Sequence, residues 1–190
     1  RQHRVTVSGL PGQEQRVTFR IESSGPAACA LANVDLVPFS TGTAPTVLLV
    51  TTDTHRGDHL GSARTPAGAL TPHLDGLARD GIAFEQCFTW TNTTNPSHMA
   101  LLTGEHPRDI GILNNFERLA DNALTLTEVF RDRGYVCWAS VAAKHLEAVS
   151  GLTQGFDRFS GPLTGERRAG PTVDSAMAWL PARAGRPLFL

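Results

Sequence analysis

TVLLVTTD, residues 46–53, is an uninterrupted run of apolar and β-branched residues that ends in a carboxylate. Such a run is typical of a strand in a parallel sheet, where helices cover both faces. We therefore expect residues 46–52 to form a strand that is buried on both faces. Asp53 follows it directly, and ligands of open α/β sheets bind outside the carboxyl ends of the strands. This position makes Asp53 a candidate ligand for a divalent cation.

Downstream of this run, helix-like and strand-like segments alternate. One helix has signals at both ends, with Thr71 as N-cap, Pro72 at the first helical position and Gly81 as the stop. Further helices are expected over residues 96–103, 125–133 and 172–180, and further strands over residues 82–88, 135–141 and from 188. The alternation predicts an α/β domain over residues 46–190, with a largely parallel sheet and flanking helices.

Residues 1–42 have a different pattern. Apolar and polar residues alternate with a period of two between Gly/Pro turns, which predicts antiparallel β structure. About three short strands do not form a stable sandwich alone. We interpret residues 1–42 as the tail of an upstream β domain, joined through a linker at residues 43–45. Because the chain opens on Arg1 and stops in a strand-like segment at Leu190, we interpret it as a fragment.

The composition is that of a globular protein, with 41% hydrophobic and 18% charged residues and a formal net charge of −1. This balance does not point to a nucleic-acid or membrane-surface partner. No apolar run approaches the roughly 20 residues that span a bilayer. The cysteines Cys29, Cys87 and Cys137 are odd in number and lie in apolar stretches. They predict buried small side chains rather than a disulfide framework or a zinc site.

A second informative stretch is TNPSHMALLTG, residues 94–104. Proline is favoured in the first turn of a helix, so Thr94 is expected just ahead of a helix N-terminus. The unpaired amides and the positive end of the helix dipole favour a phosphate or sulfate there, on residues 95–97. A threonine hydroxyl is a weak nucleophile without a base or metal, so Thr94 needs a partner such as a cation held by Asp53.

The residues alone leave other readings open. Thr94 is also compatible with a threonine-rich turn that only caps a helix, and for an isolated Asp53 a cap of the turn that follows it is the favoured reading. Asp58 and His59 could add metal ligands, but two polar residues in a turn are usually solvated, and they stay unassigned.

Four motifs in this order resemble the N-terminal half of a sulfatase-like domain of the alkaline phosphatase superfamily, over about residues 45–190. They are the strand ending in Asp53-Thr54, then Asp58-His59-Leu60-Gly61, then Thr71-Pro72-His73-Leu74-Asp75, and finally Pro96-Ser97-His98 with Leu101-Leu102-Thr103-Gly104. The resemblance implies one or two divalent cations, zinc, calcium or manganese, with Asp53 and Thr94 among the ligands. It also implies Thr94 as the nucleophile and Asn115 as a contact to an oxygen of the transferred group. Without the resemblance, Asn115 would be interpreted as part of a turn.

Two positions depart from the family pattern. Sulfatases have Cys or Ser at the nucleophile position, where oxidation gives a formylglycine aldehyde. The β-carbon of Thr94 carries a methyl group and would give a ketone, so we expect no formylglycine and a direct attack by the hydroxyl. His98 stands where typical sulfatases have Arg, and either steadies Thr94 or an oxygen or only packs. Lys144-His145 lacks the Gly-Lys-x-His spacing of sulfatases and predicts the start of a surface helix through Val149.

The resemblance implies a metal-dependent hydrolase of sulfate or phosphate/phosphonate esters in the complete protein, acting on a small-molecule, glycan or lipid ester. The alternatives are a phosphoryl-group transferase of the same superfamily and a catalytically inactive sulfatase-like binding module. We expect the 190-residue chain itself to be inactive, because in this family further metal ligands come from the C-terminal half of the domain. Family habit favours a periplasmic or secreted location.

Overall fold

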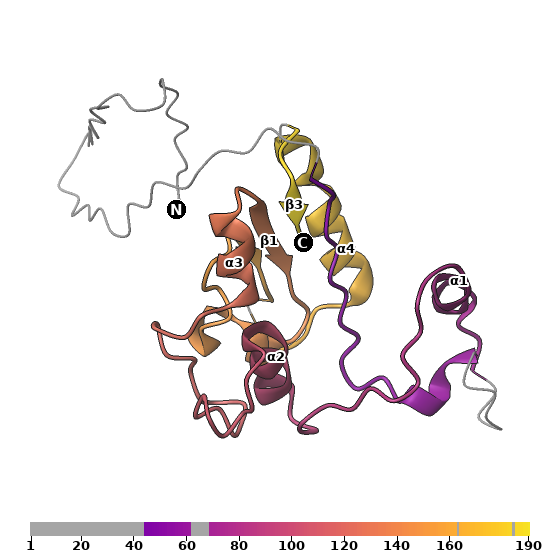
Figure 1. Cartoon of the computed structure of the whole chain (residues 1–190), viewed down its shortest axis with the longest axis horizontal. Helices are drawn as coiled ribbons and strands as arrows, with labels where there is room; N and C mark the ends of the chain where they lie inside the picture. Colours follow the sequence, from indigo (N-terminus) through magenta and orange to yellow (C-terminus); the bar gives the residue numbers. More distant parts are fainter. Residues whose placement is uncertain (1–43, 62–68, 163, 184) are drawn as a thin grey trace. The chain divides into compact units, whose positions relative to one another are not determined.

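The computed structural model describes residues 44–61, 69–162, 164–183 and 185–190. The predicted β domain over residues 1–42 and Cys29 lie outside the described residues. The helices and strands are α1 (Pro72–Asp80), α2 (Thr94–Thr103), α3 (Leu126–Asp132), β1 (Val136–Ser140), β2 (Arg158–Ser160), α4 (Ala169–Met177) and β3 (Leu188–Phe189) (Figure 1). Short 3-10 turns lie at η1 (Gly57–His59), η3 (Lys144–Leu146), η4 (Ala148–Ser150) and η5 (Leu180–Arg183). In this part of the chain, no helix is long and apolar enough to cross a bilayer.

The strands form a parallel sheet in the order β2-β1-β3. Val47 continues it on the free side of β3, because it pairs in parallel with Phe189. Its amide donates to the Leu188 carbonyl at 2.8 Å, and its carbonyl accepts from the Leu190 amide at 3.0 Å. The predicted α/β class with a largely parallel sheet is therefore confirmed, and Asp53 lies beyond the carboxyl end of the extended segment that starts at Val47.

Alternate residues of the sheet pack on opposite faces, as the pleat of a strand requires. On one face, Cys137 and Phe189 pack against Phe130 of α3. On the other face, Trp138 and Leu188 pack against Trp179 and Leu180, which directly follow α4. Figure 1 shows β1 and β3 between α3 and α4, and the two apolar faces explain why the sheet is covered on both sides of β1.

The run at residues 46–52 is extended beside β3 but is not buried on both faces. Val47 packs against the cluster around Cys137 and Phe189. The side chains of Leu48 and Val50 are 63% and 69% exposed. Burial on both faces needs a covering layer on each face, and the described residues supply such cover at Val47 alone.

Local capping signals identified two helices well. α1 starts after Thr71 with Pro72 at its first position and ends at Gly81, as predicted. α3 starts after Thr125, which forms a capping box with Glu128: the Thr125 hydroxyl accepts from the Glu128 amide, and the Glu128 carboxylate accepts from the Thr125 amide. The first residues of both helices were predicted from local sequence, whereas the Thr71 side chain makes no cap hydrogen bond and the Thr125–Glu128 capping box was not predicted.

Four sequence predictions were wrong in detail. Residues 82–88 form no strand and are exposed, because no described segment pairs with their backbone. Cys87 lies in this segment and is exposed, whereas Cys137 is buried as predicted. α4 begins at Ala169, which places Pro171 in its first turn, where proline is tolerated. The segment after Lys144 forms the two 3-10 turns η3 and η4 in place of a surface helix, because Leu146 is drawn into the core.

An apolar cluster holds α2 in place. Its buried members are Met99, Leu102, Ile112, Leu119, Ala143, Leu146 and Leu152. Met99 and Leu102 belong to α2, and the others come from the loop before α3 and from the turns after β1. The packing of these two side chains fixes the helix whose first residue is Thr94.

Candidate active site

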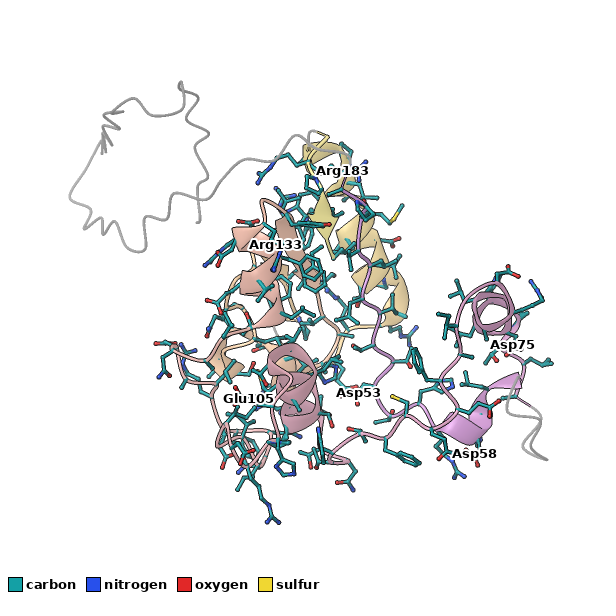
Figure 2. The ribbon with its side chains drawn as sticks, viewed as in Figure 1. Asp53, Asp58, Asp75, Glu105, Arg133 and Arg183 are labelled. Atoms are coloured by element: carbon teal, nitrogen blue, oxygen red, sulfur yellow. The ribbon has the colours of Figure 1, made fainter. Side chains whose placement is uncertain are left out.

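Thr94 and Asp53 meet, although they are 41 residues apart in the sequence. The Thr94 hydroxyl donates a hydrogen bond to Asp53 Oδ2 at 3.1 Å. Figure 2 shows Asp53 beside α2. Thr94 is the first residue of α2 and Thr93 is the N-cap, so the helix begins one residue earlier than expected and includes the candidate nucleophile. The structure thus brings together the hydroxyl and the carboxylate that the sequence singled out.

The backbone directly after Asp53 is strained. Thr54 has a φ of 58°, in the left-handed region that β-branched residues rarely adopt. Such a conformation costs about 1–3 kcal/mol and persists only where the surrounding structure imposes it. Strained residues of this kind cluster at active sites, and this one lies next to the carboxylate that contacts Thr94.

His98 lies one helical turn after Thr94, and both its ring nitrogens have partners. Nδ1 is 2.8 Å from the Thr94 carbonyl oxygen, and Nε2 is 3.1 Å from the Thr51 hydroxyl. Neither nitrogen contacts the Thr94 hydroxyl. His98 was expected either to steady Thr94 or an oxygen, or only to pack. Its contact with the Thr94 carbonyl favours the first role, through the backbone of Thr94.

Asn115 caps the start of α2. Its Oδ1 accepts from the amide of Asn95 at 2.9 Å, so it satisfies one of the amides that a helix N-terminus leaves unpaired. Asn95 is fully buried, and its own Nδ2 donates to the carbonyls of Asn114 at 3.2 Å and Glu117 at 2.8 Å. The structure therefore places Asn115 at the start of α2, and its contact to a transferred group stays a prediction.

These contacts correct one expectation about anion binding. Residues 95–97 were expected to offer free amides, but the Asn95 amide donates to Asn115 and the Ser97 amide donates to the Thr93 carbonyl. Pro96 has no amide hydrogen. The start of α2 can therefore attract an anion through its dipole, and not through the amides of these three residues.

Asp58 and His59 form a separate charged cluster with Arg56. The guanidinium of Arg56 donates to both carboxylate oxygens of Asp58, at 2.9 and 2.6 Å, and His59 Nδ1 lies 2.9 Å from Asp58 Oδ1. The hydrogen bonds from Arg56, and then from His59, hold the pKa of the Asp58 carboxyl well below its usual range. Among the described residues, neither Asp58 nor His59 makes a hydrogen bond to Asp53 or Thr94. The ring of His145, from the Lys144-His145 pair, contacts the ring of Phe116.

A divalent cation at this site would need several oxygen or nitrogen ligands. Asp53 and Thr94 offer oxygen atoms, the donors that hard cations prefer. Within the described ranges, however, no group of three or more His, Cys, Asp and Glu side chains converges on one point. The pair fits a cation in kind and supplies only part of a coordination sphere.

Thr51 was not singled out from the sequence, and Ser97 was singled out only within the anion-binding stretch 95–97 and the motif Pro96-Ser97-His98. Thr51 contacts His98, and Ser97 donates to the Thr91 carbonyl at 2.8 Å, tying the segment before α2 to the helix. A signal for Thr51 was available: it lies two residues before Asp53, the spacing at which side chains of an extended segment share one side. Nothing local in the sequence marks the contact of Ser97.

A parallel sheet between helices, with a hydroxyl and a carboxylate paired beyond its carboxyl edge, makes this an α/β domain with a candidate site where such folds bind ligands. The Sulfatase family model matches residues 45–175. This match spans more than half of the chain, and the chain belongs to the sulfatase family.

Curated relatives agree with this assignment. The chain is 36% identical over 93 residues to an ulvan-active sulfatase of Formosa agariphila, which is 49% of this chain and 18% of that protein. It is 28% identical over 133 residues to an N-acetylglucosamine-6-O-sulfatase of Bacteroides thetaiotaomicron, covering 68% and 22% of the two proteins. Against arylsulfatase A of Bos taurus the identity is 34% over 129 residues, with 62% and 25% covered. The chain thus spans about a fifth to a quarter of the length of these relatives.

Proposed function

We propose that the complete protein hydrolyses esters of a tetrahedral oxyanion, sulfate or phosphate/phosphonate, with Thr94 as the nucleophile. The observation that carries the proposal is the 3.1 Å hydrogen bond from the Thr94 hydroxyl to Asp53, at the first residue of a helix. Membership of the sulfatase family supports a sulfate or related ester as the substrate.

In the proposed reaction, Thr94 Oγ1 attacks the central sulfur or phosphorus atom of the ester. A bond from Oγ1 to that atom forms, and the bond from that atom to the leaving alcohol oxygen breaks. The hydroxyl proton is directed to Asp53 Oδ2 by the hydrogen bond already present. The leaving oxygen takes this proton from Asp53 and departs as the alcohol. Water then attacks the same sulfur or phosphorus atom, the bond from that atom to Oγ1 breaks, and one proton of the water returns to Oγ1.

The residues around Thr94 prepare this attack. His98 holds the Thr94 carbonyl and Asn115 caps the next amide, so the first turn of α2 is fixed at both points. The positive end of the helix dipole favours the negative charge of the ester group, by about 0.3–1 kcal/mol at an exposed site. Together these contacts orient the hydroxyl before the substrate binds.

Asp53 and Thr94 would hold a divalent cation through their oxygen atoms, with further ligands needed to complete the site. When bound, such a cation supplies Lewis-acid polarisation of the ester and a lower pKa for a hydroxyl beside it. Zinc, calcium and manganese are the candidates. The oxygen donors of Asp53 and Thr94 favour the harder cations among them, whereas thiolate ligands would favour softer metals.

The names of the relatives suggest the kind of ester. They include sulfatases of ulvan and of N-acetylglucosamine, and an arylsulfatase. We therefore propose sulfated glycans and aryl sulfates as the first substrates to test. Aryl phosphate and aryl phosphonate complete the panel, because the replacement of Cys or Ser by Thr94 separates this chain from formylglycine chemistry.

The test is turnover of this panel by the complete protein and its Thr94→Ala and Thr94→Ser variants. Thr94→Ala should abolish turnover of the ester that the wild type cleaves and leave the fold intact, because the N-cap of α2 is Thr93. Thr94→Ser keeps the hydroxyl and should retain part of the activity. Thr103→Ala is the matched control at the other end of α2, where the hydroxyl donates to the Met99 carbonyl and accepts from the Glu105 amide, away from Asp53. Full activity in Thr94→Ala would remove Thr94 from the mechanism.

A further inference from the structure

Two hydrogen bonds join the segment before Asp53 to the first turns of α2. One runs from Thr94 to Asp53 at 3.1 Å, and the other joins Thr51 and His98, also at 3.1 Å. Thr51 and Asp53 are two residues apart on the extended segment, and Thr94 and His98 are four residues apart on α2. These are the spacings at which side chains share one side of an extended chain and one face of a helix. The two contacts are therefore neighbouring links between the same two segments.

The hydrogen-bonding chemistry fixes which nitrogen of His98 carries its hydrogen. The Thr94 carbonyl, 2.8 Å from Nδ1, can only accept, so Nδ1 is the protonated nitrogen. In the neutral ring, Nε2 then has a free lone pair, and the Thr51 hydroxyl donates to it. A hydroxyl that donates to Nε2 stabilises this tautomer over the one with hydrogen on Nε2.

We propose that Thr51 is a positioning residue for Thr94 and acts through His98. By holding the Nδ1–H tautomer, Thr51 keeps the ring bonded to the Thr94 carbonyl, and the first turn of α2 stays at a fixed distance from Asp53. The two links then cooperate, because the Thr51–His98 contact sets the spacing that the Thr94–Asp53 contact needs. The effect on turnover rests on the proposed function, whereas the tautomer of His98 does not.

The first measurement is the tautomer itself. In the complete protein with ¹⁵N-labelled histidine, at about pH 8.5 where an imidazole of ordinary pKa is neutral, long-range ¹H–¹⁵N spectra report which ring nitrogen is protonated. His98→Gln assigns the signals. We expect Nδ1 of His98 in the protonated range and Nε2 in the unprotonated range. In Thr51→Val, the Nε2 signal should move towards the protonated range, and Thr51→Ser should restore the wild-type position.

The second measurement is kinetic. Thr51→Val should lower kcat on the cleaved ester by about tenfold with KM little changed, since Thr51 is assigned no contact with the substrate. Thr51→Ser keeps a hydroxyl at the same place and should recover most of kcat. Thr52→Val removes a neighbouring hydroxyl that makes no hydrogen bond within the described residues, and should match the wild type in both measurements.

The results separate the two claims. A wild-type His98 with hydrogen on Nε2, or a Thr51→Val variant with wild-type ring signals or wild-type kcat, would overturn the role of Thr51. If the ring signals behave as expected but Thr94→Ala keeps full turnover, the proposed function fails and the claim that Thr51 acts on the nucleophile fails with it. The link between Thr51 and His98 would then stand as a structural contact only.

Discussion

A methyl group on the β-carbon distinguishes Thr94 from the serine or cysteine that sulfatases convert to formylglycine. The structure gives its hydroxyl a carboxylate partner in Asp53 at 3.1 Å and a position at the first residue of α2. Both features suit a hydroxyl that attacks without prior oxidation. Under the proposed function, the side chain at position 94 therefore decides which kind of chemistry this site performs.

The expected absence of formylglycine at position 94 can be tested by the mass of the peptide that contains it. The peptide that contains Thr94, isolated from the complete protein, should have the mass of its unmodified sequence, because oxidation at this β-carbon cannot give an aldehyde. Mass spectrometry with fragmentation across residues 94–98 checks this. A carbonyl at position 94 would contradict direct attack by the hydroxyl.

The carboxylate of Asp53 should matter through its charge. Asp53→Asn keeps an acceptor for the Thr94 hydroxyl but loses the negative charge that would hold a cation, so turnover should fall by about 100-fold or more. Steady-state kinetics of the complete protein measure this loss. Asp80→Asn, at the exposed end of α1 where Asp80 pairs with Arg79, is the control and should keep wild-type rates. Equal rates in the two variants would argue against Asp53 as a metal ligand.

At the scale of the elements, the start of α3 shows how closely neighbouring segments approach. Gly155 has a φ of 82°, and a Cβ built on it would lie 2.8 Å from the amide nitrogen of Glu128 in the first turn of α3. Gln154 donates to the Glu128 carboxylate at 2.9 Å from the same loop. The loop before β2 thus packs directly against the capping box of α3.

Gly155→Ala should therefore destabilise the fold. The added methyl group meets backbone atoms of α3, and the left-handed conformation disfavours any residue other than glycine. We expect a loss of more than about 1 kcal/mol in the free energy of unfolding, measured by urea denaturation. Gly170→Ala is the control, because a Cβ there meets nothing within 4 Å. Equal midpoints for the two variants would mean that the loop moves away at little cost.

The capping box gives a second test at this scale. Thr125 is almost fully buried, and Thr125→Ala removes the hydroxyl that accepts from the Glu128 amide. We expect a loss of about 1 kcal/mol, within the range of 0.5–2 kcal/mol for N-cap residues, and recovery in Thr125→Ser. Urea midpoints of the three proteins check this, and a Thr125→Ser variant no more stable than Thr125→Ala would show that packing of the methyl group is what matters.

At the scale of the whole molecule, the helices and strands that were predicted correctly are those set by residues close together in the sequence. The bounds of α1, the start of α3 and the apolar strand β1 depend on local sequence, and they were predicted. Residues 82–88 look like a strand but form none, since a strand needs a partner and the sequence does not show whether one is in reach. The burial of residues 46–52 failed for the same reason, because it depends on covering layers from elsewhere.

The candidate site follows the same rule. Asp53 and Thr94 could be singled out because a strand end and a helix start mark where ligands bind in an α/β domain. The cap that Asn115 forms on Asn95, 20 residues away, could not be foreseen, because a loop conformation brings the two together. The hydrogen bond between Thr51 and His98 spans 47 residues and needed the same long-range information.

Metal binding should depend on more of the protein than the described residues. Asp53 and Thr94 are two donors, and tight binding of a divalent cation requires more. Calorimetry with zinc, calcium and manganese should therefore show weak binding by the 190-residue chain and tight binding by the complete protein. Tight binding by the 190-residue chain would mean that it holds a full ligand set.

The most direct test of Thr94 as the nucleophile is the capture of its covalent ester. The complete protein is mixed with the ester that it cleaves, quenched in acid within the first turnover, and digested for mass spectrometry. The account predicts that the peptide with Thr94 gains the mass of one sulfo or phospho group, located on Thr94 by fragmentation, and that Thr94→Ala gains none. Turnover with no adduct at Thr94 under these conditions, or with the adduct on another residue, would contradict it.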